Sequence, residues 1–224
     1  MANKKIFHII VFIIIVGCLT GCVTTQYANK SFKSQEIDRI VILPFMDNRK
    51  NPDPRFDFAE MVSNGNTTMI RTLKYKKKYR TILSGDIGNV SSYSVQDLPS
   101  RDLKSGYTSS IDPESVDPEW IKQLGPSTER WVLVPVIEEI SHSNVLLQVR
   151  GKVELSVYLF NKHTGELWWQ RSSKFEVYAG FIIYGVLKAA PGKNVLEGMA
   201  LSAAVQECIK NLPKRTGPYL LPDK

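Results

Sequence analysis

Few side chains in this 224-residue sequence have the types and spacing needed for acid–base or metal chemistry. Beyond residue 21 there are two histidines: His142 lies between two serines and His163 lies in a turn-like stretch, so we expect neither to act as a ligand or a base. Glu138 and Glu139 are adjacent in a predicted strand and would point to opposite faces. No glycine-rich phosphate loop is present. We therefore expect no catalytic residue, no metal and no cofactor, and a hydrolase is the least favoured interpretation.

Cys22 is the exception, because its surroundings predict a specific modification. Residues 19–22 read Leu-Thr-Gly-Cys and resemble a bacterial lipobox. They follow two lysines and an apolar run over residues 6–18, which is the layout of a secretory signal. The pattern predicts a signal peptide over 1–21, cleavage between Gly21 and Cys22, and a diacylglycerol on Cys22. An uncleaved signal anchor is the alternative, but a spanning helix needs about 20 apolar residues.

The lipid would fix both the location and the cysteine chemistry. Acyl chains contribute about 0.8 kcal/mol for each buried methylene, so two or three chains hold a protein on a bilayer. Val23 stands where an aspartate would favour inner-membrane retention, so we expect the outer membrane, with the domain facing the periplasm. Cys18 would be lost with the signal and Cys22 used by the lipid. Cys208 then has no partner for an intrachain disulfide.

The rest of the chain divides by composition. Residues 22–36 are polar and predict a lipidated tether between the anchor and the fold. Residues 37–213 are expected to form a single α/β domain, with a flexible insertion at 84–115 that is rich in Ser, Gly, Asp and Pro. Residues 214–224 are expected to be a loose tail. The net charge of +7 is modest and spread along the chain.

The first third of the domain predicts a strand, a helix and a second strand. Residues 39–45 are continuously apolar, which is typical of a buried strand. Asp53 and Pro54 offer a helix start, and an apolar stripe with helical spacing runs from there to Leu73, interrupted by Gly65. A strand over 79–83 would complete a parallel crossover. The basic run at 74–80 fits a solvated helix end better than a site for anionic lipid, a glycan-linked polymer or nucleic acid.

The last third predicts antiparallel strands and a closing helix. Residues 131–137 are apolar, with Pro135 indicating an edge or a bulge, and 145–178 read as one long hairpin. Trp168 and Trp169 are adjacent in it, so one ring is expected in the core and one outside. Asn194 and Glu197 form a capping-box pattern before an amphipathic helix. The fold class is thus α/β: a mixed sheet of about five strands covered by helices, with one long antiparallel hairpin.

Residues 179–187 are the most apolar segment after the signal, and glycines flank their core. A patch of this size is seldom left in water, so it needs the domain core, the bilayer or another protein chain as cover. We expect it to be the contact for self-association or for an envelope partner. The possible interface residues are Phe181, Ile182, Ile183, Tyr184, Val186 and Leu187.

Taken together, the lipobox, the polar tether, the strand over 41–48 ending in a Leu-Pro-Phe turn, the hairpin around 161–169 and the final helix closing on Asn211, Leu212 and Pro213 resemble the CsgG/LpoB-type lipoproteins. That superfamily is similar in fold to the amino-terminal domain of TolB. The resemblance implies a non-enzymatic outer-membrane lipoprotein that binds other envelope proteins or a second copy of itself. Its role would be as a subunit of a secretion or surface-structure complex, or as an activator of a peptidoglycan synthase. A pore-forming secretion subunit of the curli-export type is the alternative.

Overall fold

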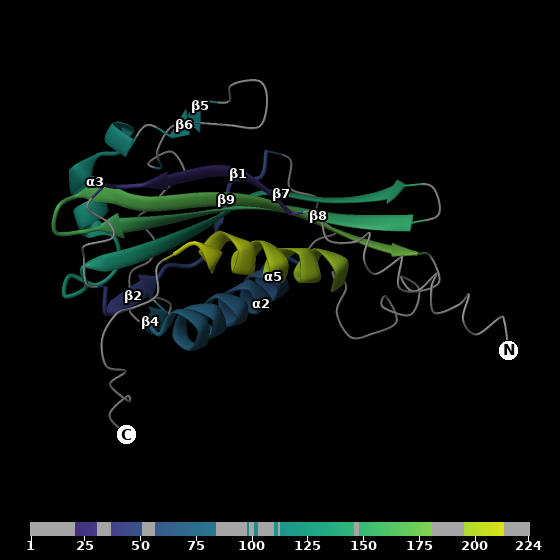
Figure 1. Cartoon of the computed structure of the whole chain (residues 1–224), viewed down its shortest axis with the longest axis horizontal. Coiled ribbons are helices and arrows are strands. Elements are labelled where there is room, and N and C mark those ends of the chain that lie inside the picture. The colour runs from purple at the N-terminus through teal and green to yellow at the C-terminus, as the bar shows by residue number, and fades with distance from the viewer. Residues whose placement is uncertain are drawn as a thin grey trace, which may run out of the picture.

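A computed structural model describes residues 21–30, 37–50, 57–83, 98, 101–102, 110–111, 113–145, 148–180 and 195–212. It is an α/β structure, as the sequence predicts, built on one mixed sheet. The sheet has seven strands rather than about five, and they follow the order β1-β9-β8-β7-β2-β4, with β3 pairing with β7. The two extra strands are β1 and β3. Figure 1 shows the helices α2 and α5 side by side on one face of the sheet.

The predicted parallel crossover is confirmed. β2 (Arg39–Ile42) pairs in parallel with β4 (Arg80–Leu83), and α2 (Phe58–Arg71) followed by a π-helical turn, η2 (Thr72–Lys76), connects them. The helix begins later than predicted, because Asp57 is its N-cap and its side chain accepts from the backbone N–H of Glu60. α2 runs unbroken through Gly65, where an added Cβ would lie 2.9 Å from the ring of Phe45. That glycine therefore serves close packing.

Three long strands form the centre of the sheet. β7 (Trp131–Val145), β8 (Gln148–Asn161) and β9 (Glu166–Gly180) pair antiparallel in sequence, which confirms the predicted hairpin and adds a second one. Pro135 lies in a central strand, not at an edge. It falls between the residues of β7 that pair with β2 and those that pair with β3 (Met46–Asp47), so its missing N–H breaks no ladder. We call β7, β8 and β9 the central ribbon.

The prediction of a tether from residue 22 is wrong for its first part. β1 (Gly21–Ala28) pairs antiparallel with β9 along its whole length, with one irregularity near Val23. A polar composition is compatible with an edge strand, because one edge and part of one face of such a strand stay in contact with water. Residues 31–36 lie outside the described residues.

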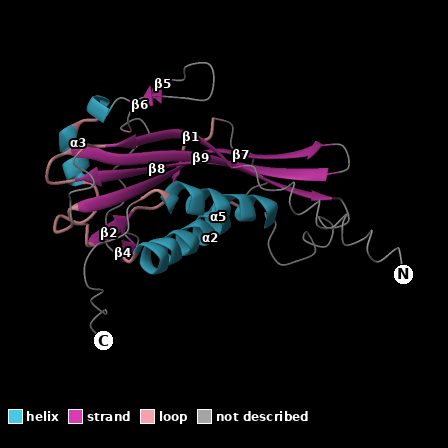
Figure 2. Ribbon diagram, in the orientation of Figure 1, coloured by secondary structure: helices cyan, strands magenta, loops and turns pink. Residues whose placement is uncertain are grey.

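Both faces of the sheet are packed, by different elements. The larger core lies under α2 and α5 (Val195–Lys210), and cyan helices cover that face in Figure 2. The smaller core lies on the other face, where α3 (Pro118–Gln123) buries Ile121 beside Tyr158 and Phe160. Asp117 caps α3 as its Asp-Pro start predicts, and the chain leaves the helix through Gly125 at a φ of 61°.

Trp168 and Trp169 correct a prediction made from strand alternation. Both side chains are buried in the same core, with only 4% and 1% of their surface exposed. The pairing of β8 with β9 shifts by one residue at Leu159 and Phe160, so Trp169 faces Leu159 while Leu167 faces Phe160. Such a bulge breaks the regular alternation of side chains and lets two adjacent residues share a face.

Most of the insertion at 84–115 and the whole tail from residue 213 lie outside the described residues, so neither the predicted flexibility nor the loose tail is tested. The described part of the insertion contains a small antiparallel pair, β5 (Arg101–Asp102) with β6 (Ser110–Ile111), and a 3₁₀ turn, η5 (Pro113–Ser115). Leu98 packs against the smaller core. Within the described ranges, no helix is both long and apolar enough to cross a bilayer.

Candidate functional site: the anchor-proximal end of the sheet

The predicted lipidation residue lies at the start of a sheet strand. β1 begins at Gly21, and Cys22 stands opposite Lys174 of β9. Cleavage before Cys22 would therefore remove only the first residue of β1. The pairing continues to Ala28, opposite Trp169, so the strand runs along the edge of the sheet from the predicted anchor toward the β8–β9 turn. The cysteine is thus joined to the folded sheet with no spacer between them.

The central ribbon continues beyond the anchor. Gly21 pairs with Phe175, yet β9 runs on to Gly180 opposite Gln148 of β8. At about 3.3 Å for each residue, the overhang is about 17 Å long. The three strands extend past β1 and past α5 at the right of Figure 1. This end of the ribbon is therefore the part of the described structure that lies beyond the predicted anchor.

One face of the central ribbon carries paired charges from the level of Cys22 into the overhang. We call these residues the polar ladder: Glu139, Arg150, Lys152, Glu154, Lys174 and Glu176. They meet in rows across the strands, with Lys152 opposite Glu176 and Glu154 opposite Lys174. Lys152 forms an ion pair with Glu139, and Glu176 lies 3.7 Å from Arg150 and 3.4 Å from Lys174. The ladder holds three cations and three carboxylates, so it is charge-balanced.

Glu176 is the centre of the ladder. Its carboxylate accepts a hydrogen bond of 2.6 Å from the hydroxyl of Tyr178. Burial acts to raise the pKa of Glu176, but the hydrogen bond from Tyr178 and the charges of Lys174 and Arg150 outweigh it and lower that pKa below its usual value. The same hydrogen bond raises the pKa of Tyr178. The ladder therefore holds Glu176 ionised.

The opposite face of the ribbon packs against the first turn of α5 where the overhang begins. His142 of β7 and Glu197 in the first turn of α5 are joined by a 2.6 Å hydrogen bond between Nδ1 and Oε1, and the Glu197 side chain is only 4% exposed. Gly151, opposite His142, permits this approach, because a Cβ there would lie 2.9 Å from the Cβ of Leu196. The capping box predicted for Asn194 and Glu197 stays a prediction, and the structure adds a contact of the Glu197 carboxylate with His142. Asn194 lies outside the described residues.

The remaining candidate residues are dispersed. His163 is exposed in the β8–β9 turn, where its backbone N–H donates to Asn161. Glu138 accepts from Asn48 whereas Glu139 pairs with Lys152, so the two carboxylates do not converge. Cys208 is buried, with its sulfur 3.6 Å from backbone oxygens. In the described part of the chain, no group of three His, Cys, Asp or Glu side chains could hold a metal ion.

The predicted interface residues, Phe181, Ile182, Ile183, Tyr184, Val186 and Leu187, lie outside the described residues. β9 ends at Gly180, so the segment follows directly from the overhang. The predicted lipidation residue and the predicted apolar interface are therefore both connected through the chain to the same end of the ribbon.

Sequence reasoning missed several side chains at the other end of the molecule. Lys77 is buried, and its Nζ donates to the backbone oxygens of Lys210 and Leu212 at the end of α5. Lys162 likewise donates to the oxygens of Gly125 and Pro126, and its removal from water lowers its pKa. Lys77 belongs to the basic run at 74–80, for which the sequence predicts a solvated helix end. A lysine that binds carbonyls of a distant helix leaves no local pattern.

Comparisons with known proteins come from structure alone, because no family model and no curated protein sequence matches the chain. The PelC dodecamer from Paraburkholderia phytofirmans is 11% identical, with a TM-score of 0.48 over 88% of this chain and 100% of that one. Lipoprotein GNA1162 from Neisseria meningitidis is 18% identical, with a TM-score of 0.37 over 76% and 96%. A minor lipoprotein from Acinetobacter baumannii is 8% identical, with a TM-score of 0.39 over 82% and 100%.

Two of these three proteins are described as lipoproteins. At such TM-scores and identities, none of the likenesses bears on what this chain binds. The narrower resemblance to CsgG/LpoB-type lipoproteins stays a prediction.

Proposed function

We propose that this protein is an outer-membrane lipoprotein, anchored through a diacylglycerol on Cys22, that serves as a non-enzymatic assembly or interaction module of the cell envelope. The domain faces the periplasm. One observation carries the proposal: the Leu-Thr-Gly-Cys sequence is followed immediately by a strand of the sheet, so the anchor and the fold are continuous. Two or three acyl chains on Cys22 would hold that end of the sheet at the bilayer surface.

The anchor geometry determines what the membrane-facing end can do. With no spacer, the overhang of the central ribbon would be held beside the lipid, and the predicted apolar interface follows its last residue, Gly180, in the sequence. That segment can be covered by the bilayer or by another protein chain, and a protein partner suits a module that assembles envelope complexes. The partner would be another envelope protein or a second copy of the chain; nucleic acid is not proposed as one.

The lack of a catalytic group in the sequence supports a binding role. The two histidines of the mature chain lie far apart along the sequence, and His142 is bound to a buried carboxylate of α5 that anchors the helix to the ribbon. The contact between His142 and Glu197 therefore serves to hold α5 on the ribbon. A module of this kind acts through its surfaces rather than through bond-making residues.

The lipid is tested by growing cells with a labelled fatty-acid analogue and comparing Cys22→Ala with Cys208→Ala as the matched cysteine control. Label is expected in the wild type and in Cys208→Ala and is expected to vanish in Cys22→Ala, which should remain uncleaved or become soluble. Fractionation of the two membranes should place the wild type in the outer membrane. Wild-type protein without label, or recovery in the inner membrane, would refute the corresponding part of the proposal.

A pore-forming secretion subunit of the curli-export type is the second candidate, and the overhang favours it. Residues 148–154 of β8 alternate between half-buried and buried positions, the pattern expected of a strand that separates two environments. The packing of α5 on the buried face of β8 and β9 weighs against this candidate, since a barrel strand presents that face to lipid. Purified protein that conducts ions across a planar bilayer would favour the pore, and no conductance would favour the interaction module.

A further inference from the structure

A groove lies between α2 and α5 on the side of these helices away from the sheet. Its volume is about 520 Å³. The side chains that line it include amides and hydroxyls from both helices, among them Asn64, Thr67, Thr68, Ser202 and Gln206. The hydroxyls of Thr68 and Ser202 are 3.2 Å apart and join the two helices. The lining also includes the apolar side chains of Val195, Met199 and Ala203, and the carboxylate of Glu60. The groove therefore offers hydrogen-bond partners and apolar contacts to a polypeptide segment.

The same surface carries the exposed large apolar side chains. Among the described residues, Tyr75 and Met199 are the large hydrophobic residues that stay exposed, at 62% and 50%. Met199 lines the groove on the α5 side. Tyr75 follows Arg71, which lines the groove, by about one helical turn. Tyrosine and methionine are enriched in protein interfaces, and flexible methionine adapts to varied peptide partners.

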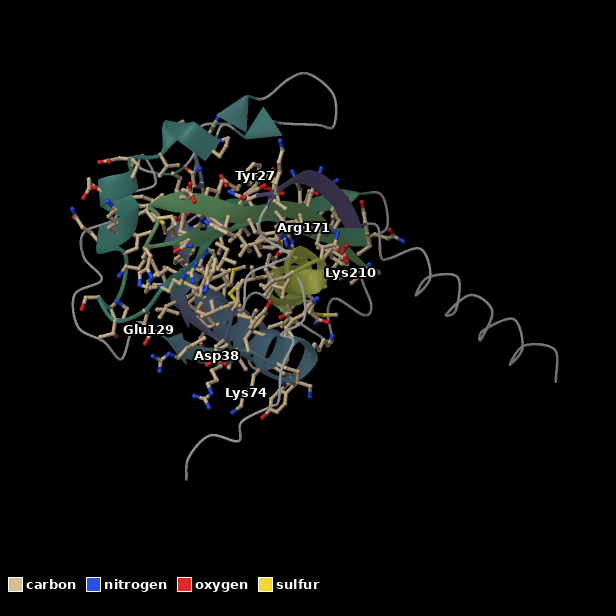
Figure 3. All side chains as sticks on the ribbon, turned by 60° about the vertical axis from the view of Figure 1, so that its left-hand side comes forward. Tyr27, Asp38, Lys74, Glu129, Arg171 and Lys210 are labelled. Carbon is tan, nitrogen blue, oxygen red and sulfur yellow. The ribbon has the colours of Figure 1, made fainter. Side chains whose placement is uncertain are left out.

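Cations gather where the groove reaches the ends of the two helices. We call Arg71, Lys74 and Lys76 the basic end. Lys74 places its Nζ 5.7 Å from the ring of Tyr75, and Lys76 donates to Gln206 of the groove at 3.2 Å. Figure 3 shows Lys74 projecting from the end of the helix, away from the sheet.

The backbone carbonyls at the end of α5 do not depend on the basic end for a hydrogen-bond donor, because Lys77 donates to them. Glu207, the acidic side chain next to Gln206, is bound instead by Arg171 at 3.0 Å and by Lys210 at 3.5 Å. Glu60, the carboxylate in the groove lining, lies in the first turn of α2, at the opposite end of that helix from Arg71. The basic end therefore presents a net positive charge beside the groove and two exposed apolar side chains.

We propose that the α2–α5 groove is a docking site for an acidic polypeptide segment of an envelope partner. The carboxylates of the segment would lie over the basic end, its backbone would bond to the amides and hydroxyls of the groove, and an apolar side chain would contact Met199. Complementary charge gives such a surface its selectivity and its association rate. The inference deepens the proposed function by naming the chemistry of one partner, and it rests on that function for the location of the partner.

The test uses the full chain, purified in detergent, and a fluorescein-labelled peptide rich in glutamate that carries two leucines. A peptide with lysine in place of every glutamate is the control probe. Binding is followed by fluorescence anisotropy at low and high salt. The matched variants are Lys74→Glu at the basic end and Lys122→Glu on α3, which lies on the other face of the sheet and whose side chain is 45% exposed. Met199→Ser tests the apolar contact without a change of charge.

The acidic peptide is expected to bind more weakly as salt rises, and the lysine peptide is expected not to bind. Lys74→Glu should weaken binding by about tenfold. Met199→Ser should weaken it several-fold, and Lys122→Glu should leave it unchanged. All variants should melt at the wild-type temperature. Absence of wild-type binding, or equal losses in Lys74→Glu and Lys122→Glu, would overturn the proposal. So would displacement of the peptide by phosphatidylglycerol vesicles, which would assign the surface to lipid. Fatty-acid labelling of Cys22 tests the lipid anchor separately, so the anchor proposal and the docking proposal can fail independently.

Discussion

The two ends of the molecule handle charge in opposite ways. At the anchor-proximal end, the cations of the polar ladder face carboxylates across neighbouring strands, and Glu176 is held by Arg150, Lys174 and Tyr178. At the basic end, cations on α2 and η2 outnumber the available acids, and one buried lysine binds helix carbonyls instead. Balanced charge stabilises the ribbon, whereas the unbalanced charge of the basic end is the basis of the docking site that we propose. The difference suggests that the ribbon end depends on packing and pairing and that the helix end depends on solvent and ligands.

The ribbon end should be most sensitive to the contact between β8 and α5. Gly151→Ala places a Cβ 2.9 Å from Leu196 Cβ and 3.1 Å from its backbone carbon, so α5 must shift away from β8. We expect a loss of about 1–3 kcal/mol in the free energy of unfolding, measured by urea denaturation. Gly198→Ala is the control, because a Cβ at that helical position meets nothing within 4 Å. An unchanged Gly151→Ala variant would show that α5 is not held close to the ribbon.

Substitutions at the helix end should lower the free energy of unfolding by less, and only the one at the buried Lys77 should have a clear effect. Lys77→Ala leaves the backbone oxygens of Lys210 and Leu212 without their donor, so we expect a loss of about 1–3 kcal/mol, nearer the lower figure because water can reach the end of the helix. Lys76→Ala, at an exposed position in the same run, should change the free energy of unfolding by less than about 0.5 kcal/mol. Equal effects of the two substitutions in urea denaturation would remove the distinction between the buried lysine and the basic end.

The smallest expected effect is a pH dependence of the polar ladder. The folded pKa of Glu176 is lowered, so its contribution to stability is present above the unfolded pKa of about 4.3 and is lost as the pH falls through the folded value. Glu176→Gln should therefore be less stable than the wild type at pH 7, and the difference should shrink at about pH 3. Urea denaturation at both pH values measures this. A difference that stays constant with pH would show that the ladder does not depend on the ionised carboxylate.

The order of the elements could be predicted from local patterns. The apolar run of β2, the helical stripe of α2, the Asp-Pro start of α3 and the long hairpin all follow from spacing within about 15 residues, and local spacing is what propensity and periodicity report. The modification predicted for Cys22 is also local, because the Leu-Thr-Gly-Cys sequence and the apolar run before it are adjacent. The structure places Cys22 at the start of β1 and leaves its lipidation to the labelling experiment.

The candidate surfaces could not be predicted in the same way. The α2–α5 groove forms only where α2 packs beside α5, and its residues Thr68 and Ser202 are 134 positions apart in the chain. Glu197 also contacts His142 on another element, 55 positions away in the chain. Neither contact leaves a short-range signal.

The sequence by itself determined the α/β class, the crossover, the hairpin and the motif at Cys22, because each depends on neighbours along the chain. Only the tertiary structure decided that residues 21–28 form an edge strand, that a one-residue shift in pairing buries both Trp168 and Trp169, and that Lys77 closes the end of α5. The physical reason is the same in each case. Strand pairing, register and the satisfaction of buried polar groups are settled by partners distant in sequence, and the free energy of those contacts overrides local preference.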